Sequence, residues 1–234
     1  MWNSLRALSF DLDDTLWEVE PVLERAEAVL AGWLHARYPR LAALHLEEEA
    51  RAMRLVVARE HPERAHDMSW VRTEWLRRLA VASDLHPAVA DEAFAVFHAA
   101  RNDVHPYPEV AAVLAALAAR YPLYALSNGN ADIRRTPLAV HFRLGVSAGE
   151  AGAAKPDPRI FEYLFAKAGV AARDVLHVGD DPVTDVAGGR AAGCLTVWVN
   201  RCGARWPDGL APADAEVADL HGLARLLAGE SAPR

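Results

Sequence analysis

Side chains that could act on a phosphate group gather in four short segments of the sequence, DLDDT, LSNGN, AAKPDP and HVGDDPVTDV. The candidates are Asp11, Asp13, Asp14, Thr15, Ser127, Asn128, Lys155, Asp180, Asp181 and Asp185. Carboxylates that lie close together repel one another unless a cation neutralises them. Oxygen ligands suit Mg²⁺, which binds one or two carboxylates together with water and phosphate oxygens. A lysine and a serine supply the point charge and the hydroxyl donor that a phosphoryl group needs, so the set predicts magnesium-assisted phosphoryl chemistry.

Asp11 and Asp13 are separated by one residue and form the most informative pair. Two neighbouring carboxylates can take different roles, one staying ionised to attack and the other donating a proton to the leaving oxygen. An anionic nucleophile approaches an anionic phosphate only if positive charge offsets the repulsion, and a bound metal ion supplies that charge. The pair therefore indicates a nucleophile and an acid held beside a metal.

The elements that must position these residues are short apolar strands. They are expected within residues 6–10, 122–130, 144–147, 174–181 and 195–200. Helices are expected between them, at about 106–120, 158–168 and 183–192. Such alternation is typical of an α/β fold with a doubly wound parallel sheet. The carboxyl ends of parallel strands meet at one edge of a sheet, so the four segments can converge there.

The segment between the first strand and the others has a different character. From about residue 22 to residue 101, apolar residues recur at helical spacing without a strand pattern. Four amphipathic helices are expected, at about 22–38, 46–61, 68–82 and 88–101. The sequence thus predicts a catalytic core of residues 1–17 and 104–234. A helical domain of residues 18–103 would be inserted after the first strand and overhang the site.

The four segments, in this order, resemble the four motifs of the haloacid dehalogenase-like (HAD) hydrolase superfamily. The insert resembles that superfamily's helical cap of the C1 type, so the resemblance spans the whole chain and implies a Rossmann-like core. It implies that Asp11 is the nucleophile and forms an aspartyl-phosphate. Asp13 would protonate the leaving alkoxide and then deprotonate the attacking water. Dehalogenases of the superfamily lack this second aspartate because a leaving halide needs no proton, so Asp13 favours phosphate over halide.

The same resemblance assigns roles around this pair. Ser127 and Lys155 would hold the phosphoryl oxygens, helped by backbone amides near Asn128. The implied Mg²⁺ ligands are Asp11, Asp13 through its backbone carbonyl, and Asp180.

Four further residues are left with open or supporting roles. Asp181 or Asp185 would be a further metal ligand or a supporting residue, and the spacing does not choose between them. Thr15 would order the loop of the first motif. Trp17 follows that motif directly and is a candidate for substrate contact, although core packing is the commoner fate of tryptophan.

Within the superfamily, DLDDTLW, SNGNA and HVGDDPVTDV most resemble phosphatases acting on flavin mononucleotide or on the phosphorylated ribitylamino-uracil precursor of riboflavin. One alternative is a phosphomutase or phosphotransferase, in which a second substrate takes the phosphoryl group from the same aspartate. A phospho-accepting regulatory domain is an alternative from another class, but it would need no cap.

Composition limits the partners. The formal net charge is −7 and the isoelectric point about 5.8, which speaks against nucleic acid and anionic membranes. The two cysteines, Cys194 and Cys202, form no metal or disulfide pattern, and no signal peptide or membrane span is visible. A cytoplasmic protein acting on a small phosphate ester is expected, either as a monomer or as a homodimer.

Overall fold

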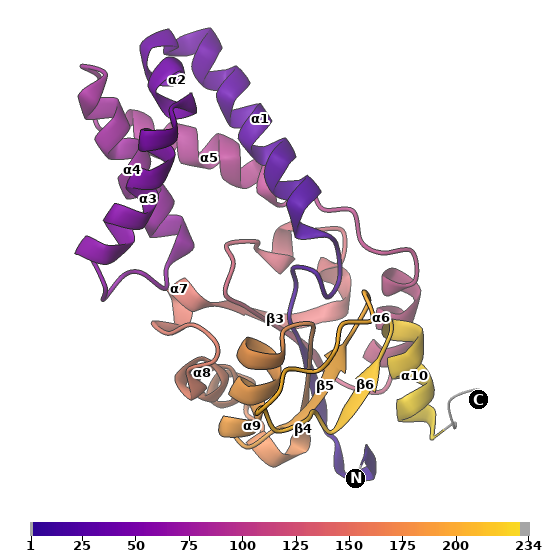
Figure 1. The fold of residues 1–234 in the computed structure, drawn as a ribbon. Coiled ribbons are helices and arrows are strands. Elements are labelled where there is room, and N and C mark those ends of the chain that lie inside the picture. The colour runs from indigo at the N-terminus through magenta and orange to yellow at the C-terminus, as the bar shows by residue number, and fades with distance from the viewer. Residues whose placement is uncertain (1, 230–234) are drawn as a thin grey trace.

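The centre of the structure, a computed structural model that describes residues 2–229, is a six-stranded parallel sheet (Figure 1). The strand order is β3-β2-β1-β4-β5-β6. The strands are β1 (Ala7–Phe10), β2 (Leu123–Ser127), β3 (Phe142–Ser147), β4 (Val175–Gly179), β5 (Leu195–Val199) and β6 (Ala215–Val217). Every strand pair is parallel, as expected for a doubly wound α/β fold.

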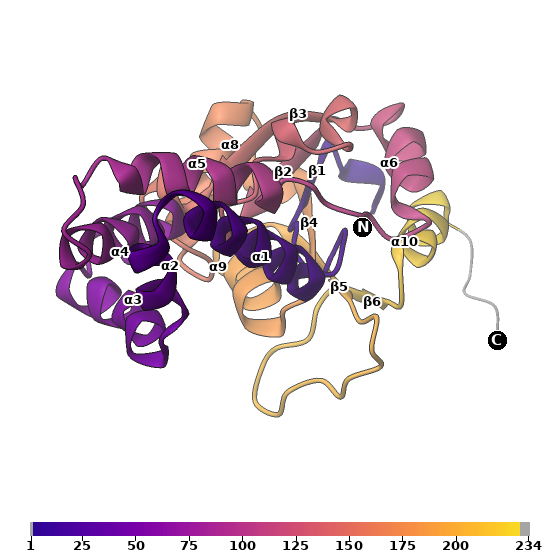
Figure 2. The ribbon, with the colours of Figure 1, turned by 90° about the horizontal axis from the view of Figure 1, so that it is seen from above.

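Helices cover both faces of the sheet (Figure 2). They are α6 (Val110–Ala118), α7 (Ala148–Ala151), α8 (Pro158–Ala168), α9 (Gly188–Ala191) and α10 (Leu220–Ala228). Successive strand residues point to opposite faces, so Leu8 and Phe10 pack with α6 and α10 while Ala7 packs with α8. The central strands are buried throughout, which explains their mostly apolar sequences, with Ser9 and His177 as buried polar exceptions.

A separate helical unit lies between β1 and α6 in the chain (Figure 1). Its helices are α1 (Val19–Arg37), α2 (Pro39–Leu46), α3 (Glu48–Glu60), α4 (Met68–Ala82) and α5 (Val89–Arg101). They enclose their own hydrophobic core, in which Leu30, Trp75 and Phe97 are fully buried. We call this unit the cap. The predicted insert, residues 18–103, contains all five helices, while residues 1 and 230–234 of the predicted core lie outside the described range.

Two helix predictions were wrong in detail. Four cap helices were expected, but the structure has five, because residues 39–46, expected to lie between the first two helices, form α2, and Glu47, which has extended backbone angles, separates it from α3. Pro39 ends α1 and also begins α2, the first helical position that proline tolerates. The helix expected at 183–192 is a π-helical segment, Pro182–Ala187, followed by α9.

Among the described residues, none of the helices is long and apolar enough to cross a membrane.

Candidate active site

The site is built at the carboxyl ends of three adjacent strands. β2, β1 and β4 are neighbours in the sheet, with Leu8 paired to Leu123 on one side and to Leu176 on the other. Asp11 follows β1, Ser127 ends β2, and Asp180 follows β4. Parallel pairing therefore brings residues far apart in the sequence to one edge.

Lys155 is the buried cation at the centre of the site. Its ammonium group donates to Oδ1 of Asp11 at 2.6 Å and to Oδ1 of Asp185 at 2.5 Å. Burial by itself lowers the pKa of Lys155, but Asp11 and Asp185 outweigh it and raise the pKa above its ordinary value. Burial raises the pKa of Asp11 well above its ordinary value, although the Lys155 charge opposes the shift. One lysine thus shares its charge between two buried carboxylates.

Asp185 is held by more than the lysine. Its Oδ1 also accepts from His177 Nε2 at 3.1 Å, and its Oδ2 accepts from the backbone N–H of Asp181 at 3.0 Å. Burial opposes ionisation of Asp185, but Lys155 and His177 outweigh it and hold the pKa below its ordinary value. Nδ1 of His177 then accepts from the Ser9 hydroxyl at 2.7 Å, so Asp185 is the fixed anion of a buried network.

Asp180 differs from Asp11 and Asp185 because its carboxylate does not bond Lys155. Its Oδ1 accepts from the Thr15 hydroxyl at 2.9 Å, and its backbone carbonyl accepts from the indole N–H of Trp198 at 2.7 Å. Burial, with a contribution from nearby Asp185, raises the pKa of Asp180 to about 7. Such a group is stabilised as an anion when a cation binds beside it.

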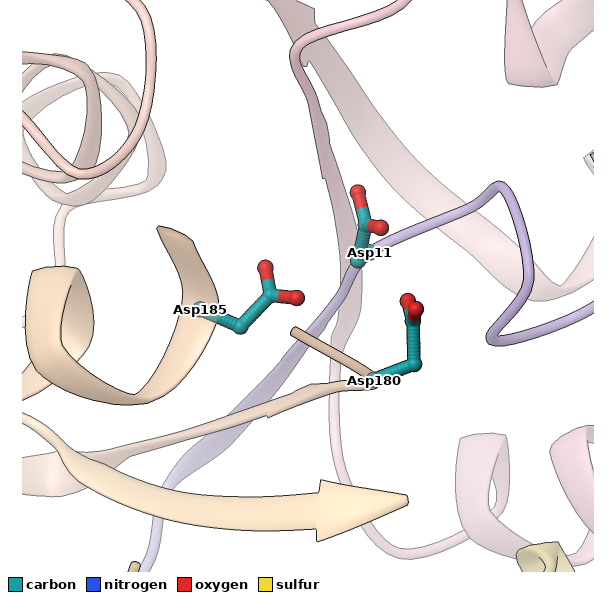
Figure 3. A group of neighbouring side chains, drawn as sticks. All are labelled: Asp11, Asp180 and Asp185. Atoms are coloured by element: carbon teal, nitrogen blue, oxygen red, sulfur yellow. The ribbon is translucent and has the colours of Figure 1, made fainter. Parts of the chain in front are cut away.

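Three carboxylates could together hold a metal ion (Figure 3). One oxygen from each of Asp11, Asp180 and Asp185 lies within 4.8 Å of the others, and Figure 3 shows the three carboxylates as neighbours at the ends of their elements. All donors are carboxylate oxygens, the ligand type that Mg²⁺ prefers. The residues present therefore fit a magnesium ion.

The carboxylates of Asp14 and Asp181 accept hydrogen bonds from backbone N–H groups instead. The Asp181 carboxylate accepts from the N–H groups of Val183 and Thr184 at 2.8 and 2.7 Å, and so caps the π-helical segment. Asp14 accepts from the N–H of Val19 at 2.9 Å, at the start of α1. Of the two alternatives for a further acidic residue, Asp185 is therefore the one beside Asp11.

Asp13 is held from the cap. Arg101, the last residue of α5, donates through Nη2 to both Asp13 oxygens, and the indole N–H of Trp17 donates to Oδ1 at 2.9 Å. Trp17 is fully buried, so the structure gives it a contact with Asp13 and no exposed face for a substrate. Gly129 lies against the same carboxylate, and a Cβ there would be 2.7 Å from Asp13 Oδ2.

The second motif positions Lys155 as well as supplying a hydroxyl. The Asn128 side chain accepts from the Lys155 backbone N–H at 2.7 Å and donates to the Lys155 carbonyl at 2.8 Å. This reciprocal pair fixes the lysine backbone beside β2. The Ser127 hydroxyl, nearly fully buried, accepts from the N–H of Gly129 at 3.0 Å.

A cavity opens above Asp13 between core and cap. It has a volume of about 370 Å³, and we call it the inner cavity. Its lining is Asp13, Val19, Leu23, Arg54, Leu55, Ala58, Met68, Val71, Arg72, Arg101, Gly129 and Asn130. Because most of these residues belong to the cap, the cap supplies the walls that a leaving group would meet.

Three polar residues of this network, Ser9, His177 and Arg101, were not predicted as site residues. The available signal was that Ser9 and His177 each interrupt an apolar strand; the structure pairs them across β1 and β4. Arg101 gave no signal, because an arginine in the last turn of a helix commonly just complements the helix dipole.

Comparison with known proteins settles the family. A family model described as haloacid dehalogenase-like hydrolase matches residues 5–193. The chain belongs to the haloacid dehalogenase-like hydrolases. The predicted family, fold class and hydrolase type are therefore confirmed.

Relatives within this family include several phosphatases. The chain is 31% identical over 202 residues to the 5-amino-6-(5-phospho-D-ribitylamino)uracil phosphatase YigB of Escherichia coli K12, covering 83% of each chain. It is 41% identical over 140 residues to a phosphoserine phosphatase of Thermus thermophilus, covering 57% of this chain and 56% of that protein. A solved structure described as a 2-haloacid dehalogenase from Pseudomonas syringae pv. Tomato DC3000 is 36% identical. It superposes with a TM-score of 0.88 over 96% of this chain and 99% of that one.

Proposed function

We propose that this chain is a magnesium-dependent phosphatase that hydrolyses a small phosphate monoester through an aspartyl-phosphate on Asp11. The observation that carries the proposal is that Asp11 bonds a buried cation, Lys155, and belongs to a group of three carboxylates that fits a magnesium ion. Asp13 lies two residues further on, at the floor of the inner cavity. A nucleophile, an acid and a source of positive charge are thus gathered at one end of the sheet.

In the first half-reaction, a carboxylate oxygen of Asp11 attacks phosphorus, and the bond from phosphorus to the leaving oxygen breaks. Asp13 gives its proton to that oxygen, so the product leaves as an alcohol. Lys155 and the Ser127 hydroxyl would bind the phosphoryl oxygens. Asp11 and Asp180 would hold magnesium, with Asp185 and the backbone carbonyl of Asp13 as further candidate ligands, and the metal would supply the charge that offsets repulsion between the phosphate and the nucleophile.

In the second half-reaction, water attacks the phosphorus of the aspartyl-phosphate. Asp13, now ionised, takes a proton from this water, and inorganic phosphate leaves with Asp11 restored. The protons balance because the one given to the alcohol is recovered from water. A phosphotransferase would differ only in the acceptor, a second hydroxyl in place of water.

Flavin mononucleotide or the phosphorylated ribitylamino-uracil is the proposed substrate. The ribitylamino-uracil phosphate is supported by the similarity to YigB, which covers most of both chains, and flavin mononucleotide by the motif resemblance. Phosphoserine is a competing candidate, because that relative is more similar over a shorter stretch.

The dehalogenase description of the similar structure makes halide release a second candidate. The presence of Asp13 argues against halide release, because a leaving halide accepts no proton and the reaction would not use Asp13 as a general acid. A regulatory phospho-acceptor is disfavoured by the cap, whose side chains wall the site.

The decisive experiment measures phosphate release from a panel of esters with and without Mg²⁺, and halide release from 2-haloacids in parallel. The panel contains flavin mononucleotide, nucleotides, sugar phosphates and phosphoserine. Magnesium-dependent phosphate release from at least one ester is expected. Halide release without phosphate release would overturn the phosphatase proposal, and a stable phosphorylated Asp11 without turnover would favour a transferase or a regulatory domain.

A further inference from the structure

A second hollow in the cap adjoins the inner cavity. It has a volume of about 540 Å³, and we call it the cap groove. Its lining is Val19, Glu20, Leu23, Glu24, Glu27, Ala28, Ala31, His45, Leu46, Arg54 and Trp75. Three of these residues, Val19, Leu23 and Arg54, also line the inner cavity, so the two hollows meet along a shared wall.

His45 is the unusual residue of the cap groove. It is 3% exposed, and neither ring nitrogen has a hydrogen-bond partner among residues 2–229. Its Nε2 lies 3.7 Å from Oε2 of Glu27, which is beyond hydrogen-bond distance. A buried polar group without a hydrogen bond costs about 1 to 3 kcal/mol. His45 has none within the described range, although its Nε2 lies at ion-pair distance from Glu27, so both ring nitrogens can still hydrogen-bond to a ligand.

The two hollows differ in charge. The inner cavity has one carboxylate, Asp13, against three guanidinium groups, Arg54, Arg72 and Arg101. The cap groove has the reverse, with three glutamates of α1 against Arg54 alone. A ligand lying across both would therefore carry its negative charge at the inner end and none at the outer end.

The shared wall is held in place by ion pairs. Glu27 accepts from Arg72 at 2.7 Å and lies 3.4 Å from Arg54, while the Arg54 guanidinium packs 4.8 Å from the centre of the Trp75 ring. Both arginines face the inner cavity, and Glu27 faces the groove. The junction is thus preorganised, which lowers the entropic cost of binding a ligand across it.

Exposed apolar side chains also line both hollows. Leu55 and Met68 in the inner cavity are 63% and 44% exposed, and Leu46 in the cap groove is 56% exposed. Apolar surface left open beside polar groups is typical of a ligand site. A small zwitterionic leaving group would leave these side chains in water, whereas a long one with a flat apolar body would cover them.

We propose that the cap groove is a subsite for the far end of the leaving group. The substrate is then a phosphate ester with a long, uncharged leaving group that has a flat apolar body and hydrogen-bonding N–H and C=O groups at its far end. His45 and Glu27 bind those groups, while the phosphate lies at Asp11. The inference rests on the proposed phosphatase function and adds the subsite, with the residues that would select a long leaving group over a short one.

The test fills the groove without touching the catalytic residues. Ala28 is an exposed residue of α1 that lines the groove, so Ala28→Trp places a large ring there. Val29, its neighbour, is 49% exposed and lies outside the lining of both hollows, so Val29→Trp is the matched control. The probes are flavin mononucleotide, whose leaving group ends in a ring imide, and phosphoserine, whose leaving group is too short to reach the groove.

The wild type is expected to have a higher kcat/KM for flavin mononucleotide than for phosphoserine. Ala28→Trp should lower kcat/KM for flavin mononucleotide at least tenfold and leave phosphoserine within about twofold, while Val29→Trp changes neither. His45→Ala should act like Ala28→Trp, with partial recovery in His45→Gln, whose amide also donates and accepts. A wild-type preference for phosphoserine, or equal losses on both esters, would overturn the subsite.

A binding measurement separates this inference from the phosphatase proposal. Riboflavin, which has no phosphate, should bind the wild-type protein with quenching of flavin fluorescence and bind Ala28→Trp at least tenfold more weakly. If no ester releases phosphate but riboflavin binds in this way, the phosphatase proposal fails and the ligand subsite stands. If riboflavin binds both proteins equally or neither, the subsite is wrong whatever the outcome of catalysis.

Discussion

Arg101 binds both carboxylate oxygens of Asp13 through one nitrogen, at 2.7 and 2.5 Å. Arg101 ends the last cap helix, and Asp13 lies just after the first core strand. The arginine side chain is nearly fully buried, with Nε and Nη1 lacking partners among the described residues. The residue proposed to move protons is therefore oriented by a side chain of the cap, and the position of the cap bears directly on catalysis.

Arg101→Gln should impair proton transfer to the leaving group, because Asp13 loses the donor that orients it. A loss in kcat of about 10- to 100-fold is expected for an alkyl phosphate, whose alkoxide needs a proton. For p-nitrophenyl phosphate, whose leaving group needs little protonation, the loss should be several times smaller. Arg205→Gln, at a highly exposed arginine, is the control. Equal losses on both esters would contradict a positioning role for Arg101.

Asp11→Asn should abolish turnover, because the amide cannot form the acyl phosphate. Thermal stability should stay close to that of the wild type, since the side chain keeps its shape and Lys155 keeps Asp185 as an ionic partner. Intact-mass measurement after acid quenching should find a phosphoryl adduct on the wild type and none on the variant. Substantial residual activity in Asp11→Asn would remove Asp11 as the nucleophile.

Lys155→Met should destabilise the protein, because it leaves the carboxylates of Asp11 and Asp185 buried without their cation. Removing one partner of a buried ion pair typically costs about 3 to 5 kcal/mol. Added MgCl₂ should recover part of this loss, since the metal restores positive charge between the carboxylates. Denaturant unfolding with and without Mg²⁺ measures both effects.

The second lysine of the chain provides the matched control for that measurement. Lys167 is 41% exposed at the side chain and pairs with Glu150. Lys167→Met should change the free energy of unfolding by less than about 1 kcal/mol, with no added response to Mg²⁺. A similar loss in the two variants would show that the buried charge cluster has no special importance.

The Glu27 cluster predicts a pH-dependent stability of the cap. Burial alone would raise the pKa of Glu27, but neighbouring His45 and the Arg72 guanidinium outweigh it and lower the pKa to about 2 from an ordinary 4.5. The folded pKa lies below the unfolded one, so the stabilisation is complete above about pH 4.5 and is lost as the pH falls toward 2. Its size is about 1 to 2 kcal/mol, allowing for a side chain that is one-third exposed.

Glu27→Gln removes this contribution. The melting temperature of the variant should lie below that of the wild type at pH 7, and the gap should narrow at pH 3. Calorimetry or circular dichroism at the two pH values measures the gap. A gap that stays constant or widens in acid would show that the ion pairs of Glu27 do not stabilise the cap.

Several elements could be predicted because local chemistry sets their limits. Helices α4 and α8 begin and end where they were predicted, because Asp67 and Asp157 cap their first turns and Pro158 can only begin a helix. The strands β1, β2 and β4 were visible as apolar runs, and the acidic motifs at their ends indicated the site. Parallel pairing brings such strand ends together, so the gathering of Asp11, Ser127 and Asp180 followed from the pattern.

Features that depend on contacts between distant residues could not be predicted from local patterns. Helix α2 was not predicted, and its buried residues Leu41 and Ala42 pack into the core of the cap. The pair of Arg101 with Asp13, the network from Ser9 through His177 to Asp185, and the unpartnered His45 join residues that no local pattern connects. A hydrogen bond or a cavity depends on distance in space, and spacing along a chain fixes that distance only within one helix or strand.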